Sequence, residues 1–190
     1  MEKTKAIELF SKYGIKLSNE NFKKLSVFEN MLLEKNKVMN LTAITDDEEI
    51  WIKHFLDSAY AVKYIGEDKK ICDVGCGAGF PSIPLAILKP DSDFILMDAL
   101  KKRLGFIDEV KAKLELNNIN SVHIRAEDAG KSKDHREKFD CVIARAVANL
   151  PVLCEYCIPL LKLNGRFIAM KSKTESAKGI EKKINLLGGK

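Results

Sequence analysis

The stretch Lys70-Ile-Cys-Asp-Val-Gly-Cys-Gly-Ala-Gly-Phe80 decides the fold of this chain. A short apolar segment ends in an acidic residue, three glycines follow at alternate positions, and a helical pattern begins. Gly75, Gly77 and Gly79 lack Cβ atoms, so the backbone can turn sharply and a ligand can lie directly against it. The N–H groups at the start of the next helix suit a carboxylate or a phosphate. The stretch therefore predicts a strand, a ligand-binding turn and a helix.

Asp73 distinguishes this stretch from a plain dinucleotide-binding fingerprint. It stands two residues before the first glycine, where that fingerprint has no need of an acid. A carboxylate at this place would suit the ammonium group of a ligand. S-adenosylmethionine carries both an amino-acid head and an adenosine, and we expect it to be the cofactor.

Short strands alternate with helical patterns from residue 70 onwards, which is typical of a parallel α/β sheet. The predicted strands are Lys70–Val74, Asp93–Met97, Ser121–Arg125, Phe139–Ala144 and Gly165–Lys171. The predicted helices are Pro81–Leu88, Lys101–Leu116, Leu150–Leu163 and Lys173–Leu187. The polar stretch Asp128–Lys138 predicts a reduced or irregular third crossover.

The part of the chain before the sheet reads as helical. Ser18 can cap a first helix with apolar residues at helical spacing, and the acidic pair Asp46-Asp47 can start a second. The stretch 40–45 between them is predicted to be a loop. The chain is thus expected to consist of a helical cap (residues 1–65) and a cofactor-binding domain (residues 66–190).

Polar residues follow the predicted strands, at the sheet edge where parallel α/β sheets bind ligands. Asp98 ends the second strand, about 20 residues beyond the glycines, where such folds place an acid for ribose hydroxyls. Glu127, or the backbone beside it, follows the third strand and can reach an adenine edge. Arg145 and Lys171 end the fourth and fifth strands and place cations where a substrate should lie. Each residue alone fits a cap, a turn or a surface charge, but together they predict a cofactor site.

The cysteines and histidines favour structural roles. Five cysteines without a framework spacing fit a reducing cytosol. Cys154-x-x-Cys157 lies within a predicted helix and lacks a second ligand pair, so we expect core thiols and no metal site. His123 and His135 suggest no function. His54 stands on a predicted helix that approaches the sheet, where a structural role and a substrate contact both stay open.

The composition is that of an ordinary globular protein, with 46% hydrophobic and 31% charged residues. No apolar stretch approaches the roughly 20 residues that span a bilayer, and no signal sequence follows the first residues. We therefore expect a cytoplasmic protein that does not bind membranes. The net charge of +5 permits a polyanionic partner without requiring one.

Several long motifs resemble one family, ribosomal RNA small subunit methyltransferase G, also called glucose-inhibited division protein B. The resemblance extends from about residue 5 over nearly the whole chain. The motifs are Asn40-Leu-Thr42, Lys53-His-Phe-Leu-Asp-Ser58, Asp73-Val-Gly-Cys-Gly-Ala-Gly-Phe-Pro-Ser-Ile-Pro84, Asp98-Ala-Leu-Lys-Lys-Arg103, Arg125-Ala-Glu-Asp128, Ala144-Arg-Ala-Val-Ala-Asn-Leu-Pro151 and Ala169-Met-Lys171.

This resemblance implies a Rossmann-like class I methyltransferase sheet preceded by a helical cap. It implies transfer of a methyl group from S-adenosylmethionine to N7 of a guanosine in 16S ribosomal RNA, free or in a small-subunit precursor, by a monomer. The cofactor positions carried over are Gly75, Phe80, Asp98, Ala99, Leu100, Ala126, Glu127 and Arg145. Lys171, with the basic residues near it, would hold RNA phosphate, and we expect Arg145 and Lys171 to serve the reaction.

Two departures from the family pattern stand out. Ser82 occupies a position where the family often has glycine, a change small enough to leave the loop intact. The sequence ends at Gly188-Gly-Lys190, where the family would continue into the last strands of its sheet. Those strands are therefore expected to be missing, which would expose a sheet edge.

The chemistry of N7 methylation agrees with the residues at the strand ends. Guanine N7 has a free lone pair and no proton, so the reaction needs placement and exclusion of water but no general base. The sequence lacks the Asn/Asp-Pro-Pro-aromatic run expected of an exocyclic-amine methyltransferase, and Cys141 lies inside a strand rather than at a nucleophile position. Arg145 can orient guanine O6 or a flanking phosphate of an unstacked loop base.

Two other functions stay open at this point. One is a methyltransferase of the same fold that acts on a small molecule or a protein. The other is a non-catalytic module that binds RNA or a nucleotide.

Overall fold

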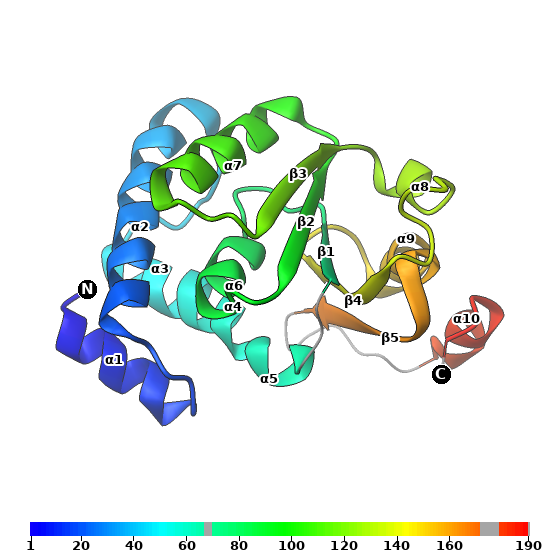
Figure 1. The fold of residues 1–190 in the computed structure, drawn as a ribbon, viewed down its shortest axis with the longest axis horizontal. Coiled ribbons are helices and arrows are strands. Elements are labelled where there is room, and N and C mark those ends of the chain that lie inside the picture. The colour runs from blue at the N-terminus through cyan, green and yellow to red at the C-terminus, as the bar shows by residue number, and fades with distance from the viewer. Residues whose placement is uncertain (67–69, 172–178, 190) are drawn as a thin grey trace.

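The computed structural model describes residues 1–66, 70–171 and 179–189. A five-stranded parallel sheet runs through its centre in the order β3-β2-β1-β4-β5 (Figure 1). The strands are β1 (Lys70–Val74), β2 (Asp93–Asp98), β3 (Ile119–His123), β4 (Phe139–Arg145) and β5 (Leu161–Met170). β1 lies between β2 and β4, so the chain reverses its direction of winding there. Ligands of such sheets bind beside this reversal, at the carboxyl ends of the strands.

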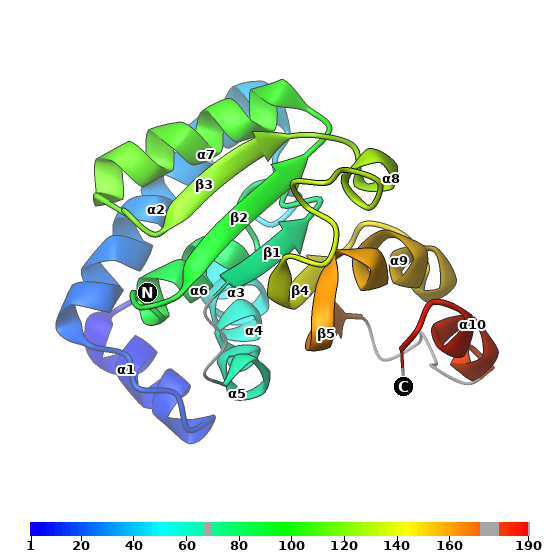
Figure 2. The ribbon, with the colours of Figure 1, turned by 45° about the vertical axis from the view of Figure 1, so that its right-hand side comes forward.

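Helices cover both faces of the sheet (Figure 2). One face carries α6 (Ser82–Leu88), α7 (Lys101–Leu114) and the helices of the first 65 residues, while α8 (Ala126–Ala129) and α9 (Leu150–Cys157) cover the other. Alternate residues of each strand point to opposite faces, so Ile71 joins the first core and Cys72 the second. This two-faced burial explains why the strands read as continuous apolar runs.

The helices of the first 65 residues pack on α6 and α7, the helices that cover this face of the sheet. They are α1 (Lys3–Lys12), α2 (Asn19–Met39), α3 (Asp47–Ile50), a π-helical segment (Trp51–Leu56), α4 (Asp57–Tyr60) and α5 (Val62–Ile65). The predicted Ser18 cap is confirmed, because its hydroxyl accepts from Asn21 N. The helix start predicted at Asp46 or Asp47 is confirmed as well, and the Asp46 carboxylate caps it by accepting from Glu49 N. Each such cap stabilises a helix by about 1 kcal/mol.

An aromatic stack joins these helices to the glycine turn. Phe28 of α2 lies 5.8 Å from Phe55 and 5.2 Å from Phe80, measured between ring centroids. The ring centroid of Phe106 in α7 lies 6.3 Å from that of Phe28. All four rings are buried and belong to one hydrophobic core. The position of the glycine turn therefore depends on packing against residues far earlier in the sequence.

The predicted strands β1, β2 and β4 are confirmed to within one residue, and two other predictions need correction. β3 begins at Ile119, two residues before its predicted start at Ser121, because buried Ile119 pairs with Phe94. The predicted helix ending at Leu163 is wrong beyond Cys157. There Pro159 lacks the N–H that would continue the α-helical ladder, a 3₁₀ turn follows, and β5 starts at Leu161.

The remaining connections agree broadly with the sequence. The reduced third crossover is confirmed, since α8 has only four residues. The predicted helix Lys173–Leu187 lies partly outside the described residues, and α10 (Glu181–Leu186) falls within its second half. Among the described residues β5 pairs only with β4 and forms one edge of the sheet. No helix in these ranges is long and apolar enough to cross a membrane.

Candidate cofactor and substrate site

The glycine turn after β1 is tied to the end of β2. The N–H groups of Gly75 and Cys76 both donate to the carbonyl oxygen of Met97, at 2.8 and 3.0 Å. The Gly77 N–H donates to Asp98 Oδ2 at 3.0 Å. The ends of β1 and β2 are therefore joined into one ledge (residues 73–79 and 97–100).

Glycine is required at the three positions of the turn for different physical reasons. A Cβ on Gly75 would lie 2.6 Å from Val147 Cγ2, and one on Gly79 would lie 2.4 Å from Ile83 Cγ1. The nearest atom to a Cβ on Gly77 would be the Gly75 carbonyl oxygen at 3.9 Å. All three have positive φ. Gly75 and Gly79 are thus needed for turn geometry and packing, and Gly77 has the bare backbone on which a ligand can lie.

Alanine at Gly79 is expected to destabilise the protein strongly. The new Cβ would meet Ile83 at 2.4 Å and sit at a φ of +96°, so a loss of about 2–4 kcal/mol in the free energy of unfolding is expected. G105A is the control, because Gly105 lies within α7 with no atom within 4 Å of its Cβ position. That variant should gain up to about 1 kcal/mol. Urea unfolding measures both, and equal stability of the two variants would contradict the packing argument.

Asp73 is a buried carboxylate without a hydrogen-bond partner among the described residues. Its side chain is fully buried at the end of β1, and both oxygens are unpaired. Burial raises the pKa of Asp73 from its ordinary value of 3.8 to about 7. Nearby Ser82, whose hydroxyl makes no hydrogen bond of its own to the described residues, and the charge of Arg145 oppose this rise, and the Asp98 carboxylate reinforces it. Unpaired buried carboxylates are costly, so this group calls for a cationic ligand.

Asp98 ends β2 beside the glycine turn, and Ala99 and Leu100 follow the strand. The Asp98 side chain is 4% exposed and accepts from the N–H groups of Gly77 and Leu100, the latter at 2.8 Å. The Ala99 carbonyl oxygen contacts His123 Nε2 at 3.0 Å. The Leu100 side chain is exposed. Asp98 therefore orders the ledge, and carboxylate oxygens can accept further hydrogen bonds from a ligand.

Ala126 and Glu127 form the first turn of α8, after β3. Glu127 Oε1 accepts from the Tyr156 hydroxyl at 2.9 Å. Backbone and Tyr156 hydrogen bonds lower the pKa of Glu127 and keep it ionised. Tyr156 of α9 was not predicted from the sequence, because only the packing of α8 on α9 brings the two together.

Arg145 ends β4, as predicted, but its guanidinium contacts the segment 53–58 on the other side of the site. Nη2 donates to the Lys53 carbonyl oxygen at 2.7 Å and lies 3.2 Å from His54 Nδ1. Nε lies 3.5 Å from Asp57 Oδ2. The carbon at the centre of the guanidinium lies 5.9 Å from the centre of the Phe80 ring. The cation therefore bridges the glycine turn and the preceding helices.

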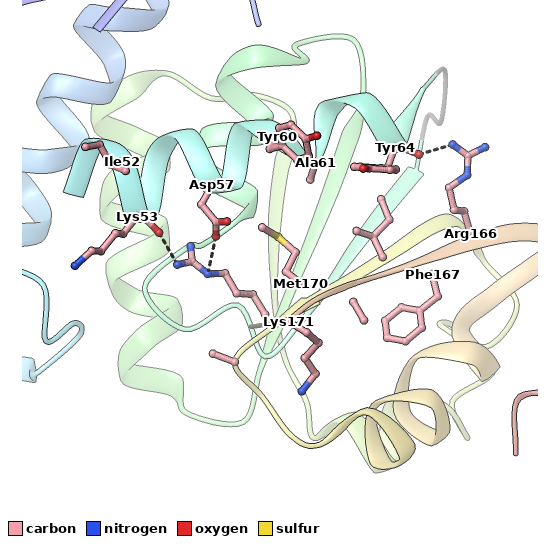
Figure 3. Close-up of a pocket in the computed structure, with 14 residues that line it drawn as sticks. Ile52, Lys53, Asp57, Tyr60, Ala61, Tyr64, Arg166, Phe167, Met170 and Lys171 are labelled. Atoms are coloured by element: carbon pink, nitrogen blue, oxygen red, sulfur yellow. Dashed lines mark hydrogen bonds and ion pairs between the residues drawn. The ribbon is translucent and has the colours of Figure 1, made fainter. Parts of the chain in front are cut away.

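A groove of about 1100 Å³ opens beside Arg145, between the segment 52–64 and β5. Lys53 and Asp57 lie on one wall, and Met170 and Lys171 lie on the other (Figure 3). Lys171 Nζ donates to the Ala148 carbonyl oxygen. The structure thus brings the two predicted cations, Arg145 and Lys171, to the same groove. None of the described residues of the ledge lines this groove.

All five cysteines are buried and free, so their prediction as core thiols is confirmed. Burial raises the pKa of Cys72 and Cys76 well above the ordinary thiol value. The described residues hold no cluster of three or more metal-ligating side chains. Ser82 is also buried in the first turn of α6 and leaves the glycine turn intact.

Comparison with known proteins identifies the family. Residues 21–188 match the sequence model of GidB, described as rRNA small subunit methyltransferase G. The chain belongs to this family. Ribosomal RNA small subunit methyltransferase G of Acetivibrio thermocellus is 48% identical over 187 residues, which make up 97% of this chain and 77% of that relative. The protein of the same name from Lactobacillus delbrueckii subsp. bulgaricus is 44% identical over 188 residues, or 96% of this chain and 79% of that relative.

Solved structures share the fold of this methyltransferase G family member. Precorrin-6y C5,15-methyltransferase from Geobacter metallireducens aligns with a TM-score of 0.52 at 19% identity, over 69% of this chain and 70% of that one. TehB from Haemophilus influenzae aligns with a TM-score of 0.50 at 24% identity, over 70% of this chain and 43% of that one. At these identities the likeness concerns the fold alone. The expected class I methyltransferase sheet is confirmed.

The described residues fit S-adenosylmethionine, the cofactor of this methyltransferase G family. Asp73 is a buried acceptor with no hydrogen-bond partner in the described part of the chain, as the ammonium of an amino-acid head requires. Gly77 leaves room for a ligand on the backbone of the turn. The bound cofactor supplies a methyl group on a sulfonium. The donors and acceptors of the ledge supply binding and orientation.

Proposed function

We propose that this chain transfers the methyl group of S-adenosylmethionine to N7 of a guanosine in 16S ribosomal RNA. The observation that carries this proposal is the unpaired carboxylate of Asp73 at the end of β1, within a member of the methyltransferase G family. In this proposal residues 1–65 act as a helical cap and residues 66–190 as the methyltransferase domain. The protein works in the cytoplasm as a monomer on the RNA or on a small-subunit precursor.

The predicted cofactor positions have separate proposed binding roles. Asp73 holds the cofactor ammonium, and Asp98 accepts from the ribose hydroxyls. The backbone turn of Gly75, Gly77 and Gly79 supports the amino-acid head. The adenine would lie among the residues Phe80, Ala99, Leu100, Ala126 and Glu127, where Leu100 offers exposed apolar surface.

Arg145 and Lys171 are proposed to hold the substrate. Guanine N7 attacks with its own lone pair, so the protein has no proton to remove and must only place the base in line and exclude water. A guanidinium can donate to guanine O6 or to a phosphate, and an ammonium suits a phosphate. Arg145 and Lys171 line the same groove, so in this proposal both cations face the bound RNA.

A transfer assay with radioactive methyl-labelled S-adenosylmethionine tests this function. Label should enter 16S RNA in small subunits. The KM for the RNA should rise steeply with salt concentration, because binding of Lys and Arg to phosphates releases counterions and high salt opposes that release. Label in a protein or small molecule alone, with no steep salt dependence, would support a different substrate. Binding of S-adenosylhomocysteine without any transfer would support a non-catalytic module.

A further inference from the structure

His54 lies at the meeting point of the cap, the glycine turn and Arg145. Its side chain is 8% exposed and stacks on Phe80, with ring centroids 4.4 Å apart and planes inclined by 23°. Nε2 lies 2.8 Å from Thr42 Oγ1, and Nδ1 lies 3.2 Å from Arg145 Nη2. Both ring nitrogens therefore have partners: Nε2 contacts Thr42 in the cap, and Nδ1 contacts Arg145 at the end of β4.

These contacts define the tautomer of the imidazole. A guanidinium only donates hydrogen bonds, so Nδ1 of His54 must accept from Arg145. The proton then sits on Nε2 and is donated to the Thr42 hydroxyl oxygen, which also accepts from Ile44 N at 3.0 Å. Burial and the adjacent charge of Arg145 lower the pKa of His54 to about 4, so the ring is neutral at physiological pH.

The π-helical segment supplies the second acceptor for Arg145. In a regular α-helix the Asp57 N–H would donate to the Lys53 carbonyl. Here that N–H donates to the carbonyls of Ile52 and His54 instead. The freed Lys53 carbonyl accepts from Arg145 Nη2 at 2.7 Å. Consecutive residues, Lys53 and His54, thus accept both hydrogens of one guanidinium nitrogen.

We propose that His54 is a positioning residue that holds the Arg145 guanidinium in the orientation in which it meets the guanosine. The inference rests on the proposed function, because it gives Arg145 a substrate to meet. With both Nη2 hydrogens committed to the cap, the remaining contacts within the described residues are longer: Nη1 lies 3.5 Å from Ser58 Oγ, and Nε lies 3.5 Å from Asp57 Oδ2. Nη1 is therefore the donor left for the substrate, and Thr42 holds the far side of the ring.

Three variants test this role by methyl transfer to small subunits. H54F keeps a flat ring against Phe80 but removes the acceptor, and kcat/KM should fall about 10-fold. H54N can present its side-chain oxygen near the position of Nδ1 and should recover most of that loss. T42V should show a smaller loss, about 3-fold, because it frees only the far nitrogen. S-adenosylhomocysteine affinity should change less than about 3-fold in all three, on the same reasoning.

A double-mutant cycle with R145A separates positioning from a general structural effect. If His54 acts through Arg145, then H54F should add no further loss when R145A is already present. Equal losses in both backgrounds, or full activity of H54F, would overturn the proposal.

Nitrogen NMR of the histidine rings adds a readout that does not depend on activity. The His54 signals should report the Nε2–H tautomer in the wild type and lose it in R145A. The opposite tautomer in the wild type would overturn the inference. A wild-type protein with this tautomer and no RNA methylation would instead overturn the proposed function.

Discussion

Replacement of Asp73 with asparagine is expected to weaken S-adenosylhomocysteine binding by about 10- to 100-fold, the cost of removing a charge-assisted hydrogen bond from a buried ammonium. The variant keeps the shape of the side chain at the end of β1, removes the charge and replaces one acceptor oxygen with an NH2 group. Isothermal titration calorimetry measures the affinity. D91N is the matched control, because Asp91 is exposed on the turn before β2 and should leave the affinity unchanged.

The same variant is expected to stabilise the cofactor-free protein at alkaline pH. Folding raises the pKa of Asp73 from 3.8 to about 7, so the folded state binds more protons than the unfolded state between these values. The contribution of Asp73 to stability is therefore greatest below pH 4 and is lost as pH rises to 7. D73N should be more stable than the wild type by about 1–3 kcal/mol at pH 8 and nearly equal to it at pH 4.

Urea unfolding at pH 4, 6 and 8 checks this pH dependence, because the difference between D73N and the wild type isolates the Asp73 contribution from other titrating groups. The opposite signs of the two effects make the test strict, since a variant that merely damages the fold would lose both stability and binding. A D73N protein less stable than the wild type at pH 8 would contradict an unpaired carboxylate.

Replacement of Arg145 with alanine is expected to lower kcat/KM for small subunits by about 30- to 100-fold, because a guanidinium that donates to guanine or phosphate is lost. S-adenosylhomocysteine affinity should fall less, by no more than about 5-fold. Methyl transfer and calorimetry measure the two effects. K113A, on the exposed face of α7, removes the same charge away from the site and should lower kcat/KM less than about 3-fold.

R145K separates the two possible contacts of Arg145. A lysine keeps the charge but loses the planar guanidinium that Lys53 and His54 hold in one orientation, so it can serve a phosphate but not a directed hydrogen bond to guanine O6. Activity of R145K close to the wild type would place phosphate opposite Arg145. Activity as low as that of R145A would place guanine there. Full activity of R145A would contradict any substrate role.

Much of the sheet could be predicted because its determinants are local. β1, β2 and β4 are apolar runs bounded by acids, glycines or polar residues, and their burial on both faces leaves a continuous signal. The start of β5 could not be predicted in this way. The segment Leu161–Leu163 continues an apolar helical pattern, and its pairing with Phe139 is a long-range contact that no local pattern contains.

The sequence could predict which residues form the site more readily than it could predict the contacts that they make. The position of Asp73 two residues before Gly75 indicated a cationic ligand group, whereas the absence of a partner depends on how all the surrounding elements pack. The π-helical segment has no clear sequence signal, so the direction in which Arg145 points could not be inferred. Val147 packs against Gly75, and that contact likewise required the folded chain.

The position and chemical form of the methylated nucleoside show directly whether this protein methylates N7 of a guanosine in 16S RNA. Small subunits that lack 7-methylguanosine in 16S RNA are incubated with this protein and S-adenosylmethionine, and the RNA is digested and mapped by mass spectrometry. We expect one new 7-methylguanosine at a single position, and we expect it to be absent when D73N replaces the wild type at low cofactor concentration. A methyl group on another atom, or no methyl group in 16S RNA although S-adenosylhomocysteine binds, would contradict the proposed function.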